Sequence, residues 1–420
     1  MVHHLDALET RAPEVREAAL MAALPSQIAH AQKNSAALAE ILKGIDAAQV
    51  TSRAALARLP VTRKYELLAR QQAQRAQDPF GGFSTIGWKG MLRPAGVRRV
   101  YQSPGPIYEP EGHAPDYWRA ARAMAAAGFE AGDLVHNCFS YHLTPGAWIM
   151  ESGAHALGCA VIPGGVGNTE QQLAAVADLR PVAYSGTPSF LKILIEKATE
   201  AGQKLSITKA LVSGEACPPS LRDWFTQQGV AAYQCYATAD VGLIAYETAA
   251  REGLVIDEGV IVEIVRPGTG DPVAVGEVGE VVVTVLNPDY PLIRFGTGDL
   301  SAILPGTCPT GRTGQRIKGW MGRADQTTKI RGMFVHPGQV AEIVKRFPEL
   351  TKARLVVTGE MANDQMALHV ETASLADEGL KGRVSEAVRD VTKLRGEVHL
   401  VAQGTLANDG KVIEDARSYQ

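Results

Sequence analysis

Apolar residues recur every three or four positions across the first 76 residues of the chain, which predicts helices rather than strands. Segments such as REAALMAALPSQIAHAQ and AALAEILKGI are rich in alanine, leucine and glutamine. The turn around Pro60 interrupts this pattern, and Thr62 is placed to cap the helix that follows. We therefore expect a helical start that carries no chemistry.

From residue 116 to residue 242, short apolar runs such as DLVHNCFS and PVAYSG alternate with amphipathic segments. This alternation of strands and helices is typical of a doubly wound, parallel sheet. Ligands of such sheets lie beyond the carboxyl ends of the strands. The loops that we expect to line a site are residues 139–144, 164–169, 187–189, 213–217 and 236–240.

Residues 253–304 change to a two-residue period in LVIDEGVIVEIV and GEVGEVVVTVL, which predicts a small antiparallel sheet or barrel. After residue 323, short strands and helices follow, as in a compact α+β domain. The pattern as a whole predicts an α/β fold with two domains. The N-terminal domain, 1–323, would hold a doubly wound, mostly parallel sheet and a small β-barrel-like sheet, and a small α+β domain would cover 324–420.

Composition and charge narrow the classes of partner. The length of 420 residues is enough for about two or three domains. A net charge of −3 gives no reason to expect a nucleic acid, and no window holds the ~18 uninterrupted apolar residues of a membrane span. The N-terminus lacks the apolar core of a signal peptide, and the five cysteines have no CxxC spacing, so we expect a cytoplasmic protein with reduced thiols. The oligomeric state stays open, with a homodimer as one option.

Two polar segments stand out after the last long strand pattern: FGTGDL at Phe295–Leu300 and GRADQTTKIRG at Gly322–Gly332. In the first, Asp299 follows an apolar strand and is preceded by two flexible glycines. A carboxylate at such a strand end can accept hydrogen bonds from both hydroxyls of a sugar diol. The alternative is an Asx turn that closes a hairpin, and for Asp299 alone this is the simpler interpretation.

With the flanking words IRFGTGDL and CPTGR, these segments resemble the phenylacetate-CoA ligase family of the adenylate-forming, AMP-binding acyl-CoA synthetases. The resemblance implies a large domain that holds ATP and the acid, and a small C-terminal lid. It also implies that Asp299 holds the ribose, that Arg323 lies near the nucleotide and that Asp325 is the hinge. Lys411, in NDGKVIEDARSY, resembles the family's Gly-Lys ending. A compact charge there would neutralise the acid and the α-phosphate during adenylation, whereas the alternative is a solvated tail lysine.

The adenine site is implied by the same resemblance. The segment Ser213–Ala216 falls where the family has its adenine loop, and Tyr236 heads the word YATAD. An aromatic ring over a flat base recognises adenine economically, although Tyr236 could instead be a core aromatic and Glu215 a carboxylate at a helix N-terminus. Asp240 stands in the family's metal position and would bind Mg²⁺, with a carboxylate one methylene shorter. The expected nucleotide-binding residues are Ser213, Gly214, Glu215, Ala216, Tyr236, Ala237, Thr238, Asp299 and Arg323.

The phosphate loop departs most from the family pattern. In the family, a Ser/Thr/Gly-rich loop ends in Gly-Lys, and its amides and lysine would cradle the phosphates. Here the segment reads QSPGP over residues 102–106. Two prolines remove amide donors and no lysine follows, so only Ser103 and Gly105 keep the family's character. We therefore expect a weak grip on ATP at this loop.

A zinc site occurs near the CPTGR segment in some relatives, built from a Cys/His/CxC set. In this chain Cys308 keeps one thiol, whereas Thr310, Thr248 and Val255 stand where further ligands would be expected. A tetrahedral structural zinc needs four nitrogen or sulfur ligands. We therefore expect no zinc site.

The segment NCFSYHLTPGAW, residues 137–148, matches the part of the family that lines the carboxylate pocket. Phe139, Tyr141 and His142 are the expected contacts of the acyl group. A ring at Tyr141 would form the floor for an aromatic or branched acid, and His142 would narrow or polarise the pocket. Phe139 and Trp148 could also be core residues, which is our interpretation of Trp148.

The sequence therefore predicts an AMP-forming acyl-CoA synthetase for an aromatic or small hydrophobic carboxylate. The acid and ATP would give acyl-AMP, and CoA would then displace AMP, with ATP/AMP, Mg²⁺ and CoA as cofactors. One alternative is an enzyme that uses a preformed acyl-adenylate or acyl-CoA without handling ATP, which the altered phosphate loop favours. The other alternative is a non-catalytic protein that binds AMP or acyl-CoA.

Overall fold

The computed structural model describes residues 4–324, 326, 328–335, 337–359, 363–407 and 411–417. The chain divides into two compact units, Met1–Met321 and Gly322–Gln420, and each is described by itself. Asp325, the expected hinge, lies outside the described residues.

Helices and short 3₁₀ turns form the start of the first unit, as the apolar spacing predicts. Thr62 differs from the prediction, because it lies in a strand and its backbone N–H donates to the Arg294 carbonyl oxygen at 3.0 Å. Arg63 takes the capping position instead, and its N–H donates to the Glu66 carboxylate at 2.8 Å. No helix in the described part of the chain has the length and apolar character that a membrane crossing needs. The elements are the turns Ala7–Thr10 and Ala47–Gln49, α1 (Pro13–Asn34), α2 (Ala36–Ile41), α3 (Arg53–Leu56), β1 (Thr62–Arg63) and α4 (Lys64–Gln74).

A nine-stranded sheet forms the centre of the first unit. Its strands are β4 (Leu134–Asn137), β5 (Ala160–Pro163), β6 (Ala183–Gly186), β7 (Lys209–Val212), β8 (Ala231–Thr238), β9 (Gly242–Glu247), β10 (Leu254–Ile256), β14 (Ile303–Leu304) and β15 (Arg316–Ile317). The strand order is β14-β15-β10-β9-β8-β7-β6-β4-β5. Neighbours from β5 to β8 pair in parallel, as predicted, whereas those from β8 to β14 pair antiparallel.

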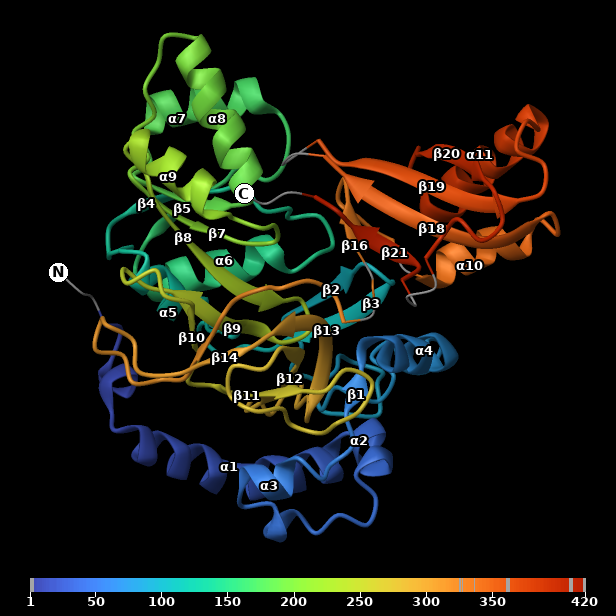
Figure 1. The fold of residues 1–420 in the computed structure, drawn as a ribbon. Coiled ribbons are helices and arrows are strands. Elements are labelled where there is room, and N and C mark those ends of the chain that lie inside the picture. Colours follow the sequence, from blue (N-terminus) through green and yellow to red (C-terminus); the bar gives the residue numbers. More distant parts are fainter. Residues whose placement is uncertain are drawn as a thin grey trace. The chain divides into compact units, whose positions relative to one another are not determined.

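Helices cover both faces of the parallel part of this sheet, which makes it doubly wound. They are α5 (Ala120–Ala126), α6 (Gly146–Ala156), α7 (Thr169–Leu179), α8 (Pro188–Glu200) and α9 (Pro219–Gln227). Figure 1 shows α7, α8 and α9 on one side of the strands and α5 and α6 on the other. The carboxyl ends of β4 to β8 therefore open toward the loops in which the sequence places the candidate site.

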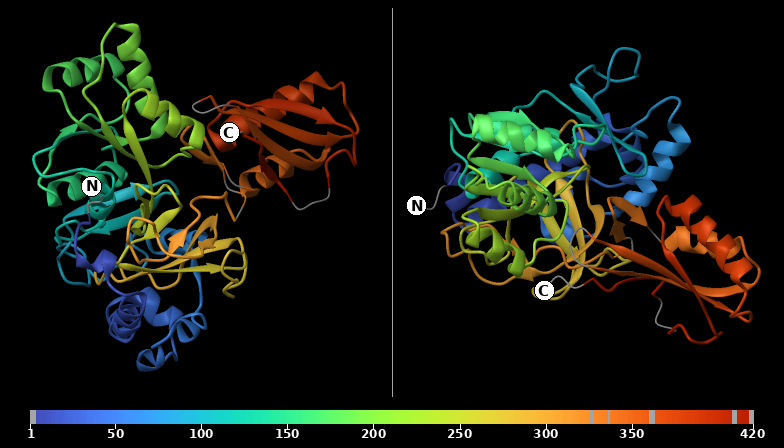
Figure 2. Two further views of the ribbon diagram at one scale, coloured as in Figure 1. Left: turned by 60° about the vertical axis from the view of Figure 1, so that its left-hand side comes forward. Right: turned by 90° about the horizontal axis from the view of Figure 1, so that it is seen from above.

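A second sheet in the first unit joins β1 to β11 (Val260–Val265), β12 (Gly279–Val285) and β13 (Phe295–Ser301), in the order β1-β13-β12-β11. Within the described residues its end strands β1 and β11 do not pair, so the sheet is open and the expected barrel-like closure is wrong. Its apolar side chains share one core with the N-terminal helices, which lie beside these strands in Figures 1 and 2. A face covered by helices needs no closure to bury its apolar residues.

The second unit is an α+β domain, as predicted. Its elements are β16 (Thr328–Ile330), β17 (Met333–Val335), α10 (Pro337–Lys345), β18 (Leu350–Thr358), β19 (Gln365–Thr372), α11 (Glu378–Thr392), β20 (Glu397–Val401) and β21 (Ile413–Asp415). A four-stranded sheet of order β20-β19-β18-β21 buries Leu355 and Leu368 against Val340 of α10 and Val384 of α11. The unit therefore has a core of its own.

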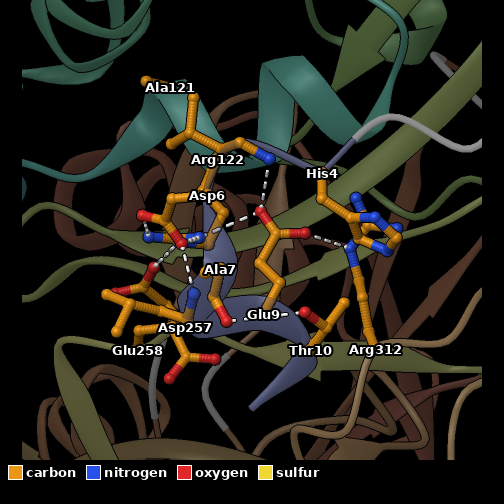
Figure 3. Close-up of polar contacts among 12 residues, drawn as sticks. His4, Asp6, Ala7, Glu9, Thr10, Ala121, Arg122, Asp257, Glu258 and Arg312 are labelled. Atoms are coloured by element: carbon orange, nitrogen blue, oxygen red, sulfur yellow. Dashed lines mark hydrogen bonds and ion pairs between the residues drawn. The ribbon is translucent and has the colours of Figure 1, made fainter.

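Buried ion pairs hold the N-terminal segment around Asp6 and Glu9 against the rest of the first unit (Figure 3). The Glu9 carboxylate, whose side chain is 0% exposed, accepts a hydrogen bond from Arg122 Nη1 at 2.9 Å and lies 2.6 Å from Arg312 Nε. Arg122 also pairs with Asp6 at 2.8 Å. Charges buried in this way are tolerated only when each has partners, so these contacts hold residues from both ends of the unit in one place.

Candidate active site

Asp299, the carboxylate that the sequence predicts to bind the ribose, accepts hydrogen bonds from two neighbouring side chains. Asp299 on β13 is buried, and Tyr236 on β8 donates its hydroxyl hydrogen bond to Asp299 Oδ2 at 2.8 Å and to Thr297 Oγ1 at 3.0 Å. Trp320 Nε1 donates to Asp299 Oδ1 at 3.1 Å. The structure therefore brings Tyr236 and Asp299 together across two sheets, and these donors orient the carboxylate.

The expected adenine loop, residues 213–216, follows β7 and is tied to its neighbours on both sides. Ser213 Oγ donates to the Cys235 carbonyl oxygen of β8 at 2.8 Å, and Ser189 Oγ at the start of α8 donates to Glu215 Oε2 at 2.5 Å. Gly214 has φ +81°, a left-handed backbone that favours glycine. Ala216 is half-buried.

Phe139 connects this loop to the expected acyl pocket. A Cβ atom placed on Gly214 would lie 3.7 Å from Phe139 Cε1, and one placed on Gly146 would lie 3.7 Å from Phe139 Cδ1. The Thr187 methyl group is 3.9 Å from the same Gly214 position. Three of the loops that the sequence selected, after β4, β6 and β7, therefore meet at Gly214.

Tyr141 presents its ring rather than its hydroxyl group. Its hydroxyl donates to Glu151 Oε2 at 2.7 Å and accepts from Asn137 Nδ2 at 2.9 Å. Burial, together with the Glu151 carboxylate, raises the pKa of Tyr141, so the phenol stays protonated. The ring stands edge-on to Trp148 with centroids 5.1 Å apart. His142 is exposed, whereas Phe139 and Trp148 are both half-buried and pack against the same core.

Asn137, which the sequence reasoning did not select, positions this loop. It is buried at the carboxyl end of β4, and its Nδ2 also donates to the Ala147 carbonyl oxygen at 2.9 Å. Its Oδ1 accepts from Ser185 Oγ of β6 at 2.9 Å. The sequence signal that could have identified Asn137 is a polar residue at the end of an apolar strand. The hydrogen-bond partners of Asn137 come from the loop after β4, from α6 and from β6.

The segment expected to hold phosphates is part of a hairpin, β2 (Arg99–Ser103) and β3 (Ile107–Glu111). Ser103 is buried and its hydroxyl donates to the Glu109 carboxylate, also buried. The Ser103 hydroxyl is therefore engaged inside the protein. Asp240, the expected Mg²⁺ ligand, has its Oδ2 2.7 Å from Lys64 Nζ at the start of α4.

The remaining nucleotide residues of the YATAD word are half-buried, and Thr238 Oγ1 accepts from the Val241 N–H at 3.2 Å. At the position where some relatives bind zinc, the Cys308 thiol lies 3.3 Å from Thr248 Oγ1 and 3.1 Å from Thr310 Oγ1. Val255 is buried in β10. Threonine hydroxyl groups and a valine are not zinc ligands, so the absence of zinc stays our prediction for this chain.

In the second unit, Lys411 is exposed two residues before β21, and its carbonyl oxygen accepts a hydrogen bond from Arg354 Nε at 3.1 Å. Arg323 is half-buried at the start of this unit. Their roles stay predictions.

Comparison with known proteins assigns both units. The family described as AMP-binding enzyme matches residues 117–285, and the AMP-binding enzyme C-terminal domain matches residues 332–415. A phenylacetate-coenzyme A ligase of Thermus thermophilus is 31% identical over 365 residues, covering 82% of this chain and 79% of the relative. The ligase of the same name from Aromatoleum evansii is 30% identical over 363 residues, with the same coverage.

Solved structures agree with these relatives. A 2-hydroxyisobutyryl-CoA ligase, solved in complex with its acyl-AMP (2-HIB-AMP) and CoA, matches with a TM-score of 0.81 and 26% identity. The match covers 98% of this chain and 92% of that structure. The resemblance stated from the sequence is confirmed.

Proposed function

This chain belongs to the phenylacetate-coenzyme A ligase family of AMP-binding enzymes, and from that membership we propose its substrate class and the roles of its site residues. The protein is an AMP-forming acyl-CoA synthetase. It joins a carboxylic acid to AMP, with release of pyrophosphate from ATP, and then transfers the acyl group to the thiol of CoA. We propose that the acid is aromatic or small and hydrophobic.

The arrangement around Phe139 carries this proposal. The Phe139 ring lies against Gly214 of the expected adenine loop and Gly146 of the acyl segment, so one ring would border both halves of an acyl-adenylate. The Tyr236 hydroxyl group orients the Asp299 carboxylate, which would accept hydrogen bonds from the two ribose hydroxyl groups. The segments 213–216 and 236–238 would hold the adenine and the sugar.

The acyl pocket would be lined by the rings of Phe139 and Tyr141. Because Glu151 and Asn137 already bind the Tyr141 hydroxyl, the ring is what this residue offers to a substrate. Aromatic and apolar walls favour aromatic and apolar acids. His142 is exposed and would stand at the entrance of the pocket.

The second unit would supply the mobile lid. Lys411 would neutralise the charge that develops on the acid and the α-phosphate, Arg323 would lie near the nucleotide, and Asp325 would be the pivot between the two steps. A CoA thiolate would then displace AMP.

One observation favours a second candidate, an enzyme that starts from a preformed acyl-adenylate or acyl-CoA. The only serine of the expected phosphate loop, Ser103, donates to the buried Glu109 carboxylate. Such a hairpin supplies few donors for a triphosphate. A protein that only binds AMP or acyl-CoA is the third candidate.

Pyrophosphate release in the presence of ATP and a panel of acids tests the proposal. We expect release that depends on the acid and is fastest with aryl or short branched acids, followed by thioester when CoA is added. Thioester formation from synthetic acyl-AMP without any pyrophosphate release from ATP would favour the second candidate. Binding of AMP with neither reaction would favour the third.

Replacement of Asp299 by asparagine is expected to weaken AMP binding by roughly 10- to 100-fold, because a hydrogen bond to a charged group contributes about 1.5–3 kcal/mol. Isothermal titration with AMP measures this change. Asp271→Asn, at an exposed carboxylate in the turn after β11, is the matched control and should bind AMP like the wild type. An unchanged AMP affinity in a folded Asp299→Asn protein would contradict the assignment of Asp299 to the ribose.

A further inference from the structure

Asp240, the buried carboxylate at the end of the YATAD word, forms an ion pair with a lysine. Asp240 is 3% exposed, and its Oδ2 lies 2.7 Å from Nζ of Lys64, the first residue of α4. The Lys64 side chain is 32% exposed, so it reaches from the surface to an acid that water hardly touches. This contact joins the helical start of the chain, where we expected no chemistry, to the nucleotide side of the large sheet.

A second acid lies beside this pair. Glu109 of β3 is 0% exposed and accepts the hydroxyl hydrogen bond of Ser103. In the described part of the chain, Glu109 Oε2 and Asp240 Oδ1 are both buried without a hydrogen-bond partner. Burial and the neighbouring Asp240 raise the pKa of Glu109 well above its usual value, and Lys64 acts in the opposite direction. Lys64 therefore faces both acids, and its single charge pairs with Asp240 while the raised pKa keeps Glu109 protonated.

The residues around Asp240 do not fit a magnesium ion. Mg²⁺ requires nearly octahedral oxygen ligands at about 2.0–2.1 Å and usually keeps several waters. The Asp240 side chain is 1% exposed and one of its oxygens already contacts an ammonium group, so a hydrated cation would have to displace Lys64. Across the described residues, no three His, Cys, Asp or Glu side chains are grouped so that they could hold a metal.

We propose that the Lys64 ammonium group takes the place of a divalent cation at Asp240, so that this protein binds an adenylate with no metal at that carboxylate. The assignment of Asp240 to the phosphate end of the site rests on the proposed function. The charge balance itself does not, because it follows from the ion pair and from the two buried acids. A fixed ammonium group would be present before the nucleotide arrives, whereas a metal would have to enter with it.

The first test measures metal binding on nucleotide-free protein, with Mn²⁺ as the probe and electron paramagnetic resonance as the readout. The wild type should leave Mn²⁺ free in solution. Lys64→Met should bind about one Mn²⁺ per chain at least roughly tenfold more tightly than the wild type. Without the ammonium group, the buried Asp240 carboxylate has lost its paired cation, which favours binding of a metal ion. The double variant Lys64→Met, Asp240→Asn should lose this gain.

The second test is a calorimetric titration with AMP, in the presence of a chelator or of excess Mg²⁺. The wild type should bind AMP equally in both conditions, within about twofold. Lys64→Met should bind AMP at least roughly tenfold more weakly with the chelator, and Mg²⁺ should restore the affinity. If the wild type did not bind AMP at all, the proposed function would fail, whereas the Mn²⁺ measurement would still decide the charge replacement.

Three further variants keep both tests decisive. Lys64→Arg retains the charge and should behave like the wild type, and Lys43→Met removes an exposed lysine after α2 as a matched control. If Lys64→Met does not fold, Asp240→Asn in the wild-type background replaces it and should leave Mn²⁺ binding absent. A wild-type Mn²⁺ site that Asp240→Asn abolishes would overturn the proposal. So would a folded Lys64→Met protein that gains no Mn²⁺ site.

Discussion

Replacement of Lys411 by alanine is expected to slow acyl-AMP formation by about 10²–10³-fold, because a charge aimed at the developing transition state is lost. Lys411 is a compact cation, exposed two residues before β21 in the second unit. Thioester formation from synthetic acyl-AMP and CoA should be largely spared, since in a two-step mechanism with a rotating lid this lysine would serve the first step only. The two half-reactions are measured separately, by pyrophosphate release and by thioester formation.

The matched control is Lys381→Ala, on α11 of the same unit, whose side chain is 46% exposed. It should leave both half-reactions near the wild-type rates. If Lys411→Ala behaved like this control, Lys411 would be a solvated tail lysine. Equal losses in both half-reactions would contradict a mechanism in which the lid rotates and presents a different face to the site in each step.

Replacement of Glu9 by glutamine is expected to reduce the free energy of unfolding of the first unit by about 3–5 kcal/mol. The Glu9 carboxylate is fully buried between Arg122 and Arg312, as Figure 3 shows, so an amide would remove the buried negative charge that both guanidinium groups face. Arg122 would keep its pair with Asp6. Denaturant unfolding followed by tryptophan fluorescence measures the change.

Glu17→Gln is the matched control for this substitution. Glu17 pairs with Arg53 at 2.8 Å, but its side chain is 42% exposed, and exposed ion pairs contribute about 0–1 kcal/mol. The difference between the two variants therefore isolates the effect of burial. A loss for Glu9→Gln no larger than that for Glu17→Gln would show that the N-terminal segment does not anchor the unit.

Local patterns were sufficient for the fold class and the family. The alternation of apolar runs and helical segments from residue 116 to residue 242 predicts the doubly wound sheet, because each period reports which face of an element is buried. The words around Asp299 and Tyr236 supply a carboxylate and an aromatic ring, although Asp299 lies inside β13 and not after a strand as expected, because FGTGDL itself pairs with β12. Periodicity and short motifs depend only on residues that are close in sequence, so they can be recognised in a single sequence.

Contacts between distant residues were decided only by the tertiary structure. Periodicity shows that a side chain is buried, but not which partner it meets, so the pairing of Lys64 with Asp240 and of Ser103 with Glu109 could not be predicted. Thr62 became a strand residue for the same reason, because the backbone of β13 offered a hydrogen-bond partner that no local pattern contains. The small sheet stays open because the N-terminal helices cover its apolar side chains. Sequence therefore determined the elements and their chemistry, and tertiary packing determined which charges meet, since burial makes an unpaired charge far more costly than an exposed one.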